Sequence, residues 1–167
     1  RSMVQPFNWQ NALIRRCTQP YKPALWVAAA LMLSACGGNP PDHLGVHDGT
    51  LSPCPDSPNC VSSQAEDATH QIAPLTLRGT PEQTQALLRQ LLVQTPWVKL
   101  VADTPGYLRA EYSSRVLRFV DDVELLIGTD AVHVRSASRL GYSDLGVNRE
   151  RIEALRQELA QAEDHSG

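Results

Sequence analysis

The chain contains none of the short motifs that mark several large enzyme classes. There is no GxSxG, no HExxH, no P-loop and no dinucleotide fingerprint, and no acidic cluster follows the EF-hand pattern. The longest signal-like apolar run, residues 24–33, is too short for a membrane-spanning helix, which needs about 20 residues. We therefore expect no resident cofactor, no metal site and no permanent transmembrane helix.

Basic residues are scarce after position 36. All 18 acidic residues lie there with only 11 of the 15 basic ones, so this part of the chain carries a net charge of −7. Lys99 is its only lysine, and it contains no basic run. Because binding to nucleic acid depends on clustered basic side chains that neutralise phosphates, we expect no nucleic-acid partner.

Residues 33–36, Leu-Ser-Ala-Cys, have the pattern of a bacterial lipobox. Basic residues precede the apolar run, and two small residues precede Cys36. The pattern predicts a lipoprotein signal peptide over residues 1–35 and a lipid on Cys36. A cleaved secretory signal with an incidental cysteine is the alternative.

The lipobox also predicts that the protein is located in the bacterial cell envelope. The residue after Cys36 is Gly37 and not the Asp that holds many lipoproteins in the inner membrane. The outer membrane is therefore favoured, with the domain facing the periplasm. Several acyl chains on one cysteine bind a membrane more tightly than a single chain, which anchors only reversibly. The membrane is therefore an expected partner.

Two cysteines remain once Cys17 is lost with the signal peptide and Cys36 carries lipid. In an oxidising envelope, Cys54 and Cys60 are expected to form a disulfide. Prolines and turn formers between them let the backbone curl back. A redox site usually has CxxC spacing; it stays open as an alternative, as does metal binding.

The rest of the chain predicts one domain. Residues 36–52, rich in Gly, Pro and polar residues, are interpreted as the lipidated N-terminus and a flexible tether, and residues 53–164 as a single α+β domain. Its expected architecture is an antiparallel sheet of four to five strands with two helices packed on one face. The expected strands cover 71–77, 97–102, 107–113, 116–127 and 131–138; one helix starts at Thr80-Pro81 and ends near Thr95, and another covers 149–162 with Asn148 as its cap.

Alternation along residues 116–127 separates a charged face from an apolar one. Asp122 and Glu124 share the charged face, to which neighbouring strands add further charges of both signs. We expect a solvated face whose opposite charges pair across strands.

Asp121 falls on the apolar face of the same strand. An ionised carboxylate there costs several kcal/mol unless it is paired. Its expected partners are Arg135, Arg139 and Arg149. Asp121 is also the one weak candidate for a catalytic residue.

A polar segment over residues 135–149 links the last strand to the last helix. Three arginines in an otherwise acidic domain suit a phosphate or a carboxylate, and a loop that feeds a helix start can bind anions. In the alternative, Asp144 satisfies those arginines internally. The candidate ligand-binding residues are Arg135, Ser136, Ser138, Arg139, Tyr142, Asn148 and Arg149.

Four ordered blocks resemble the family called domain of unknown function 1499. They are residues 51–63 (LSPCPDSPNCVSS), 70–75 (HQIAPL), 119–124 (FVDDVE) and 135–149 (RSASR through DLGVNR). The resemblance covers about residues 51–160. It implies a bacterial envelope or lipid-anchored protein, with relatives in the plant thylakoid lumen, and it implies no activity and no catalytic residue.

Three functions are consistent with these features. The leading hypothesis is a noncatalytic envelope lipoprotein that binds a small anionic or amphipathic ligand, or a partner protein. The alternatives are a hydrolase that uses Asp121 with water and a structural assembly subunit, which would expose an apolar patch.

Overall fold

The computed structural model describes residues 38–162. The predicted signal peptide, Cys17 and Cys36 lie outside the described residues, so the predicted lipidation is not addressed by the fold. Within residues 38–162, no helix has the length and apolar character needed to cross a membrane.

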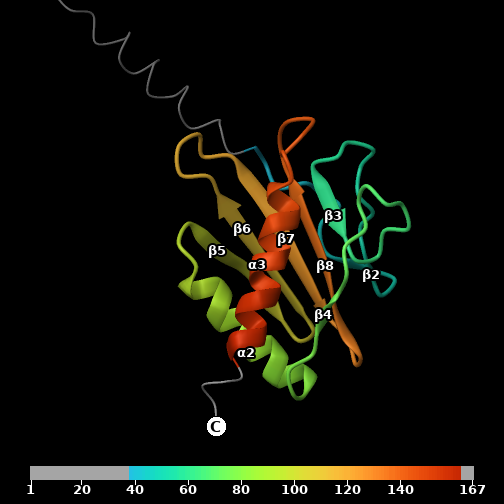
Figure 1. The fold of residues 1–167 in the computed structure, drawn as a ribbon, viewed down its shortest axis with the longest axis vertical. Coiled ribbons are helices and arrows are strands. Elements are labelled where there is room, and N and C mark those ends of the chain that lie inside the picture. The colour runs from blue at the N-terminus through green and yellow to red at the C-terminus, as the bar shows by residue number, and fades with distance from the viewer. Residues whose placement is uncertain (1–37, 163–167) are drawn as a thin grey trace, which may run out of the picture. The chain divides into compact units, whose positions relative to one another are not determined.

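Four antiparallel strands form the centre of the fold (Figure 1). They follow one another along the chain through short connections, and each pairs with the next. They are β5 (Val98–Thr104), β6 (Tyr107–Ser113), β7 (Val120–Ile127) and β8 (Ala131–Ser138). The predicted bounds of β6 and β8 are confirmed, whereas β7 starts later than predicted because residues before it form a loop in which Arg118 has a φ of 56°.

Two short strands complete the sheet at its β8 edge. β3 (Cys60–Ser62) pairs with the second half of β8, and β4 (Leu75–Thr76) pairs with its beginning. The sheet therefore has six strands in place of the four or five expected. The predicted α+β class with an antiparallel sheet is confirmed.

Helix α2 (Pro81–Gln94) starts as its sequence predicts. The Thr80 side chain accepts from the backbone N–H of Gln83, the Gln83 side chain accepts from the backbone N–H of Thr80, and Pro81 occupies the first turn.

Helix α3 (Val147–Gln161) starts two residues before the predicted point. Its N-cap is Gly146 in the left-handed conformation, so the prediction of Asn148 as the cap is wrong. The Asp144 carboxylate accepts from the backbone N–H groups of Gly146 and Asn148 and provides the capping hydrogen bonds from outside the helix. Asp144 is thereby committed to α3 and not to the arginines of its own loop.

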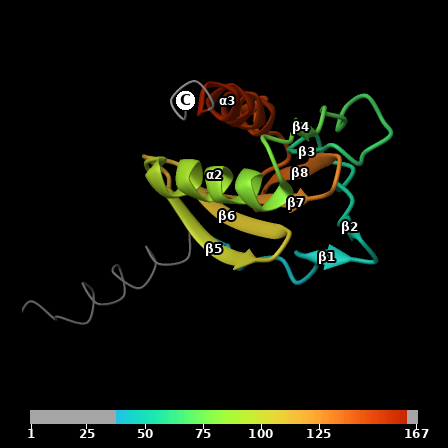
Figure 2. The same cartoon turned by 90° about the horizontal axis from the view of Figure 1, so that it is seen from below.

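Both helices lie on the same side of the sheet (Figure 2). The apolar stripe of each helix packs on alternate residues of the strands, which gives one continuous core. The helices contribute Leu88, Leu92, Ile152, Leu155 and Leu159, and the central strands contribute Leu108, Ala110, Val123, Leu125, Val132 and Val134.

A hairpin lies on the opposite side of the sheet (Figure 2). β1 (Val46–His47) pairs with β2 (Thr50–Leu51), and the turn residues Asp48 and Gly49 both have positive φ. An Asp-Gly pair favours a two-residue hairpin turn with this geometry. Residues 38–52 are thus folded onto the domain, which corrects the expectation of a flexible tether for this part of the chain.

Candidate functional site

Charged side chains from three strands meet on the sheet face that lies under the hairpin. On each strand they alternate with residues that face the helices, as the period of two requires. Strand β6 supplies Arg109 and Glu111, β7 supplies Asp122 and Glu124, and β8 with the residue that follows it supplies Arg135 and Arg139. We call these three arginines and three carboxylates the ion network.

The middle of the ion network is buried. The exposed fraction is 1% for Asp122, 0% for Glu124 and 2% for Arg135. The expected cross-strand pairing is present, but the expectation of a solvated face is wrong because residues 38–52 cover it. Buried charges require partners, and the contacts of each group can be followed one by one.

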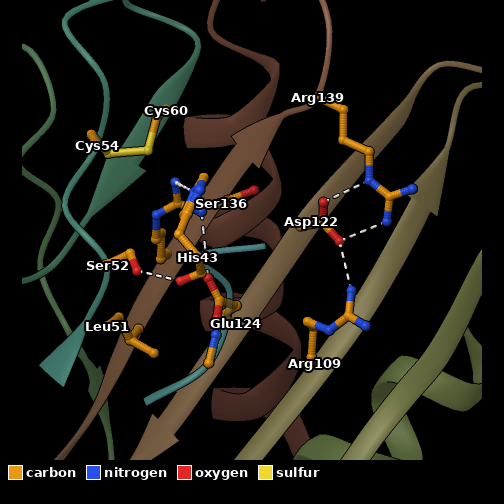
Figure 3. A network of polar contacts seen from close by, with 12 residues as sticks. His43, Leu51, Ser52, Cys54, Cys60, Arg109, Asp122, Glu124, Ser136 and Arg139 are labelled. Atoms are coloured by element: carbon orange, nitrogen blue, oxygen red, sulfur yellow. Dashed lines mark hydrogen bonds and ion pairs between the residues drawn. A yellow bond between two sulfur atoms is a disulfide. The ribbon is translucent and has the colours of Figure 1, made fainter. Parts of the chain in front are cut away.

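Asp122 is the most fully compensated carboxylate (Figure 3). Its two oxygens accept from Nε and Nη2 of Arg139 at 2.7 and 2.9 Å, and Arg109 donates to it at 3.0 Å. Arg139 also donates to Glu111 at 2.5 Å and to the Gly38 carbonyl at 3.1 Å. The hydrogen bonds to Asp122, followed by those to Glu111, raise the pKa of Arg139.

Glu124 relies mainly on neutral donors. Its Oε1 accepts from the Tyr107 hydroxyl at 2.8 Å and from the Gly45 N–H at 2.7 Å, whereas Arg135 Nη1 lies 3.4 Å from Oε2. Burial and, after it, the Glu124 charge raise the pKa of Tyr107, so this hydroxyl stays protonated and donates. The Gly45 contact fixes the hairpin segment to the ion network.

Arg135 is the least compensated cation of the network. Its Nε is buried and has no hydrogen-bond partner among residues 38–162, and its Nη2 lies 3.4 Å from His43 Nε2. Because a guanidinium only donates, His43 Nε2 has to accept in this contact. Burial lowers the pKa of Arg135, and the Glu124 charge offsets that effect only in part.

A cavity of about 550 Å³ adjoins Arg135, a volume in the range of small-molecule sites. It lies where the hairpin segment (residues 38–52), the disulfide loop (residues 54–60) and the end of β8 meet. The Cys54–Cys60 disulfide is present, as predicted, and holds the loop that forms one wall (Figure 3). The lining combines the charged groups Asp122, Arg135 and Arg139 with His43 and the apolar surfaces of Pro41, Pro53, Cys54, Pro55 and Ala137.

A buried histidine outside the cavity supports the disulfide loop. His70 Nδ1 contacts Asp67 at 2.8 Å, and its Nε2 lies 3.2 Å from the Ser57 carbonyl. The hydrogen bond with Asp67 raises the pKa of His70. Asn59 adds a second support, because its Nδ2 donates to the Gly141 carbonyl at 2.6 Å.

Five of the seven candidate ligand residues from the sequence divide between the two sides of the sheet. Arg135, Ser138 and Arg139 line the cavity, although the Ser138 hydroxyl itself accepts from Asn148 Nδ2 at 3.0 Å on the helix side. Ser136 and Asn148 are buried on the helix side, where the Ser136 hydroxyl donates to Asn148 Oδ1 at 2.5 Å.

The two remaining candidates lie away from the cavity. Tyr142 is exposed in the loop before α3. Arg149 donates to the carbonyl oxygens of Gln71 and Thr69 at 2.9 and 3.1 Å.

Asp121 faces the helices, as its parity predicts, but its partner differs from the expectation. Its Oδ2 accepts from Arg151 Nη2 at 2.6 Å, and Arg151 also donates to Asn148 Oδ1 at 2.6 Å and lies over the Tyr112 ring at 4.7 Å. Arg135, Arg139 and Arg149 bind elsewhere. Asp121 therefore belongs to the contact between sheet and α3 and is absent from the lining of the cavity described above.

Sequence reasoning missed His43, Glu124 and the proline wall of the cavity. The sequence places His43 in the expected tether and Glu124 on the expected solvated face. The pair Asp48-Gly49, between two pairs of strand-forming residues, is the signal that could have indicated a hairpin here. Among residues 38–162, no group of three or more His, Cys, Asp or Glu side chains could hold a metal ion.

Comparison with known proteins assigns the chain to a family but assigns no activity, ligand or partner. Neither the curated proteins nor the solved structures contain a match to this chain. The model of the family described as "Protein of unknown function (DUF1499)" matches residues 50–159, which include the disulfide loop, the ion network, α2 and all but the last two residues of α3. The chain therefore belongs to the DUF1499 family.

Proposed function

We propose that this protein is a lipid-anchored component of the bacterial cell envelope, on the outer membrane and facing the periplasm, and that its domain binds a small amphipathic anion without catalysing a reaction on it. The observation that carries the binding proposal is Arg135, a buried guanidinium beside the cavity whose Nε has no partner in the described part of the chain.

Charge balance supports an anion as the ligand. The network holds three arginines and three carboxylates, but Arg139 and Arg109 both converge on Asp122. Within the described residues, the Arg135 side chain keeps two contacts, each at 3.4 Å. A carboxylate or phosphate that reached its free N–H groups would supply the charge-assisted hydrogen bonds that the fold leaves unmade.

The apolar lining of the cavity favours an anion that also carries an apolar part. Three prolines, Ala137 and the disulfide present hydrocarbon and sulfur surface next to the cationic group. Pockets of this kind bury the apolar part of a ligand and use few polar groups for orientation. This combination favours an amphipathic ligand over a free inorganic ion.

The hydrolase alternative has less support. Asp121 is held in an ion pair with Arg151 and does not line the cavity. The carboxylate that does line it, Asp122, accepts three hydrogen bonds from arginines and is thereby occupied within the ion network.

Native mass spectrometry of the mature lipoprotein purified from the envelope tests the binding proposal. We expect an additional mass of stoichiometric amount on the native chain. It should be absent from the double variant Arg135→Met/Glu124→Gln, which removes both members of the buried pair and so avoids an isolated charge.

Arg149→Met is the matched control, because Arg149 is an arginine of the same segment that lies outside the cavity lining. This variant should keep the additional mass. A native chain without it, or a double variant that retains it, would contradict the assignment of Arg135.

A further inference from the structure

Large exposed apolar side chains gather at one end of the domain. They lie before β5, in the β6–β7 loop and in the β8–α3 loop, and antiparallel pairing brings these three segments to the same end of the sheet. Backbone hydrogen bonds from Ser113 to Trp97 (2.9 Å) and from Arg139 to Val120 (3.2 Å) join them. We call this the loop surface and define it by Trp97, Val116, Leu117, Leu140, Tyr142 and Leu145.

The apolar side chains of these loops are more exposed than isolated apolar residues on a surface usually are. Val116 is 87% and Leu145 92% exposed. Neither contributes to the core, so their apolar character does not serve the fold. A contiguous exposed apolar surface indicates an interaction partner.

The charge of the loop surface is opposite to that of the domain. Arg115 and Arg118 are exposed in the β6–β7 loop, and the Arg118 guanidinium lies 5.9 Å from the centre of the Trp97 ring. Asp144, the one carboxylate of the two loops, is occupied in capping α3. Arginine beside tryptophan, tyrosine and aliphatic side chains suits the interface of an anionic phospholipid bilayer.

The start of the described chain lies at this same end (Figure 1). The Gly38 carbonyl accepts from Arg139 Nη1 at 3.1 Å, and a Cβ placed on Gly38 would lie 3.7 Å from Leu140 Cγ. Cys36 precedes Gly38 by two peptide units, which span at most about 7 Å. That length is close to the ~6 Å depth of a lipid headgroup layer.

We infer that the loop surface docks flat against an anionic phospholipid bilayer, with Trp97, Val116 and Leu145 inserted at the headgroup level. The inference rests on the lipid anchor of the proposed function, because the anchor places Gly38 at the bilayer. It adds an orientation, in which the loop surface faces the lipid. The β5–β6 and β7–β8 turns lie at the opposite end of the sheet and point away from the lipid.

Trp97 reports this contact directly, since it is the only tryptophan after Cys36. The mature lipidated chain is reconstituted into phosphatidylethanolamine–phosphatidylglycerol vesicles that carry brominated acyl chains, and its fluorescence is compared with that in unbrominated vesicles. We expect bromine to quench Trp97. Quenching should weaken when phosphatidylcholine replaces phosphatidylglycerol, because the arginines then lose the anionic lipid.

Val116→Asp/Leu145→Asp should abolish the quenching while the chain stays on the vesicles. Both positions are so exposed that folding is not at stake. Val46→Asp is the matched control, because Val46 is 40% exposed on β1, outside the loop surface, and this variant should be quenched like the native chain.

The outcomes separate the inference from the anchor. If mass spectrometry finds lipid on Cys36 but Trp97 is not quenched, or if the double variant is quenched like the native chain, the docking is refuted and the anchor stands. If Cys36 carries no lipid, the anchor is refuted and the docking loses its premise with it.

Discussion

Replacing Arg135 by methionine tests the description of the ion network most directly. The substitution keeps a long side chain in the space under the hairpin and removes the cation beside Glu124. Glu124 is fully buried and would keep only the Tyr107 hydroxyl and the Gly45 N–H as partners. Removing one member of a buried ion pair costs about 3–5 kcal/mol, because the remaining charge is uncompensated. The 3.4 Å separation of this pair places the expected loss at the lower end of that range.

Adding Glu124→Gln to Arg135→Met should restore most of the lost stability. The amide oxygen of glutamine can still accept from Tyr107 and Gly45, and no isolated charge remains. We expect the free energy of unfolding to return to within about 1 kcal/mol of the native value.

The assay is urea unfolding followed by circular dichroism, in which a change of midpoint at constant slope measures stability. Two results would refute the reasoning. Arg135→Met could prove as stable as the native chain, which would mean that water reaches Glu124 and that residues 38–52 do not cover the network. Alternatively, the double variant could prove no more stable than the single one, which would mean that lost packing and not the isolated charge causes the effect.

Two further predictions concern the disulfide loop. Replacing Cys54 and Cys60 by serine should lower the free energy of unfolding by about 2 kcal/mol, as the closure of so short a loop implies; urea unfolding measures this, and an unchanged midpoint would contradict it. His70→Gln should destabilise the chain more at about pH 5.5 than at about pH 9, because Asp67 raises the pKa of His70 above its ordinary 6.5, so the stabilisation is fully present below that value and is lost as the pH rises through the folded pKa. A loss of stability that is equal at both pH values would show that His70 acts in its neutral form only.

The elements that the sequence predicts well are those with local signals. The bounds of β6 and β8 follow from turn residues on either side of alternating strands, and the start of α2 follows from Thr80, Pro81 and Gln83. β1, β2 and β4 each contain two residues, too few to show a period of two. The hairpin segment is also rich in glycines and prolines, which are typical of a tether as well as of a hairpin.

The candidate site was predicted in part for a related reason. The polar segment over residues 135–149 indicates Arg135 and Arg139 as candidates, and both line the cavity. It does not indicate which arginine keeps free donors, because that depends on competition among residues far apart in the sequence. Asp121 shows the same limit: its parity is local, but its partner Arg151 comes from a helix 30 positions later.

The folding of residues 38–52 onto the sheet limits how far the domain can lie from its attachment point. A free linker of that length would let the domain move roughly 20 Å from its attachment point. Here the Gly38 carbonyl is bound by Arg139 and the Gly45 N–H by Glu124, so the sequence leaves only Gly37 between Cys36 and the first residue that is held on the domain. With a lipid on Cys36, the protein would work within its own length of the bilayer surface, and whatever enters the cavity would have to arrive there.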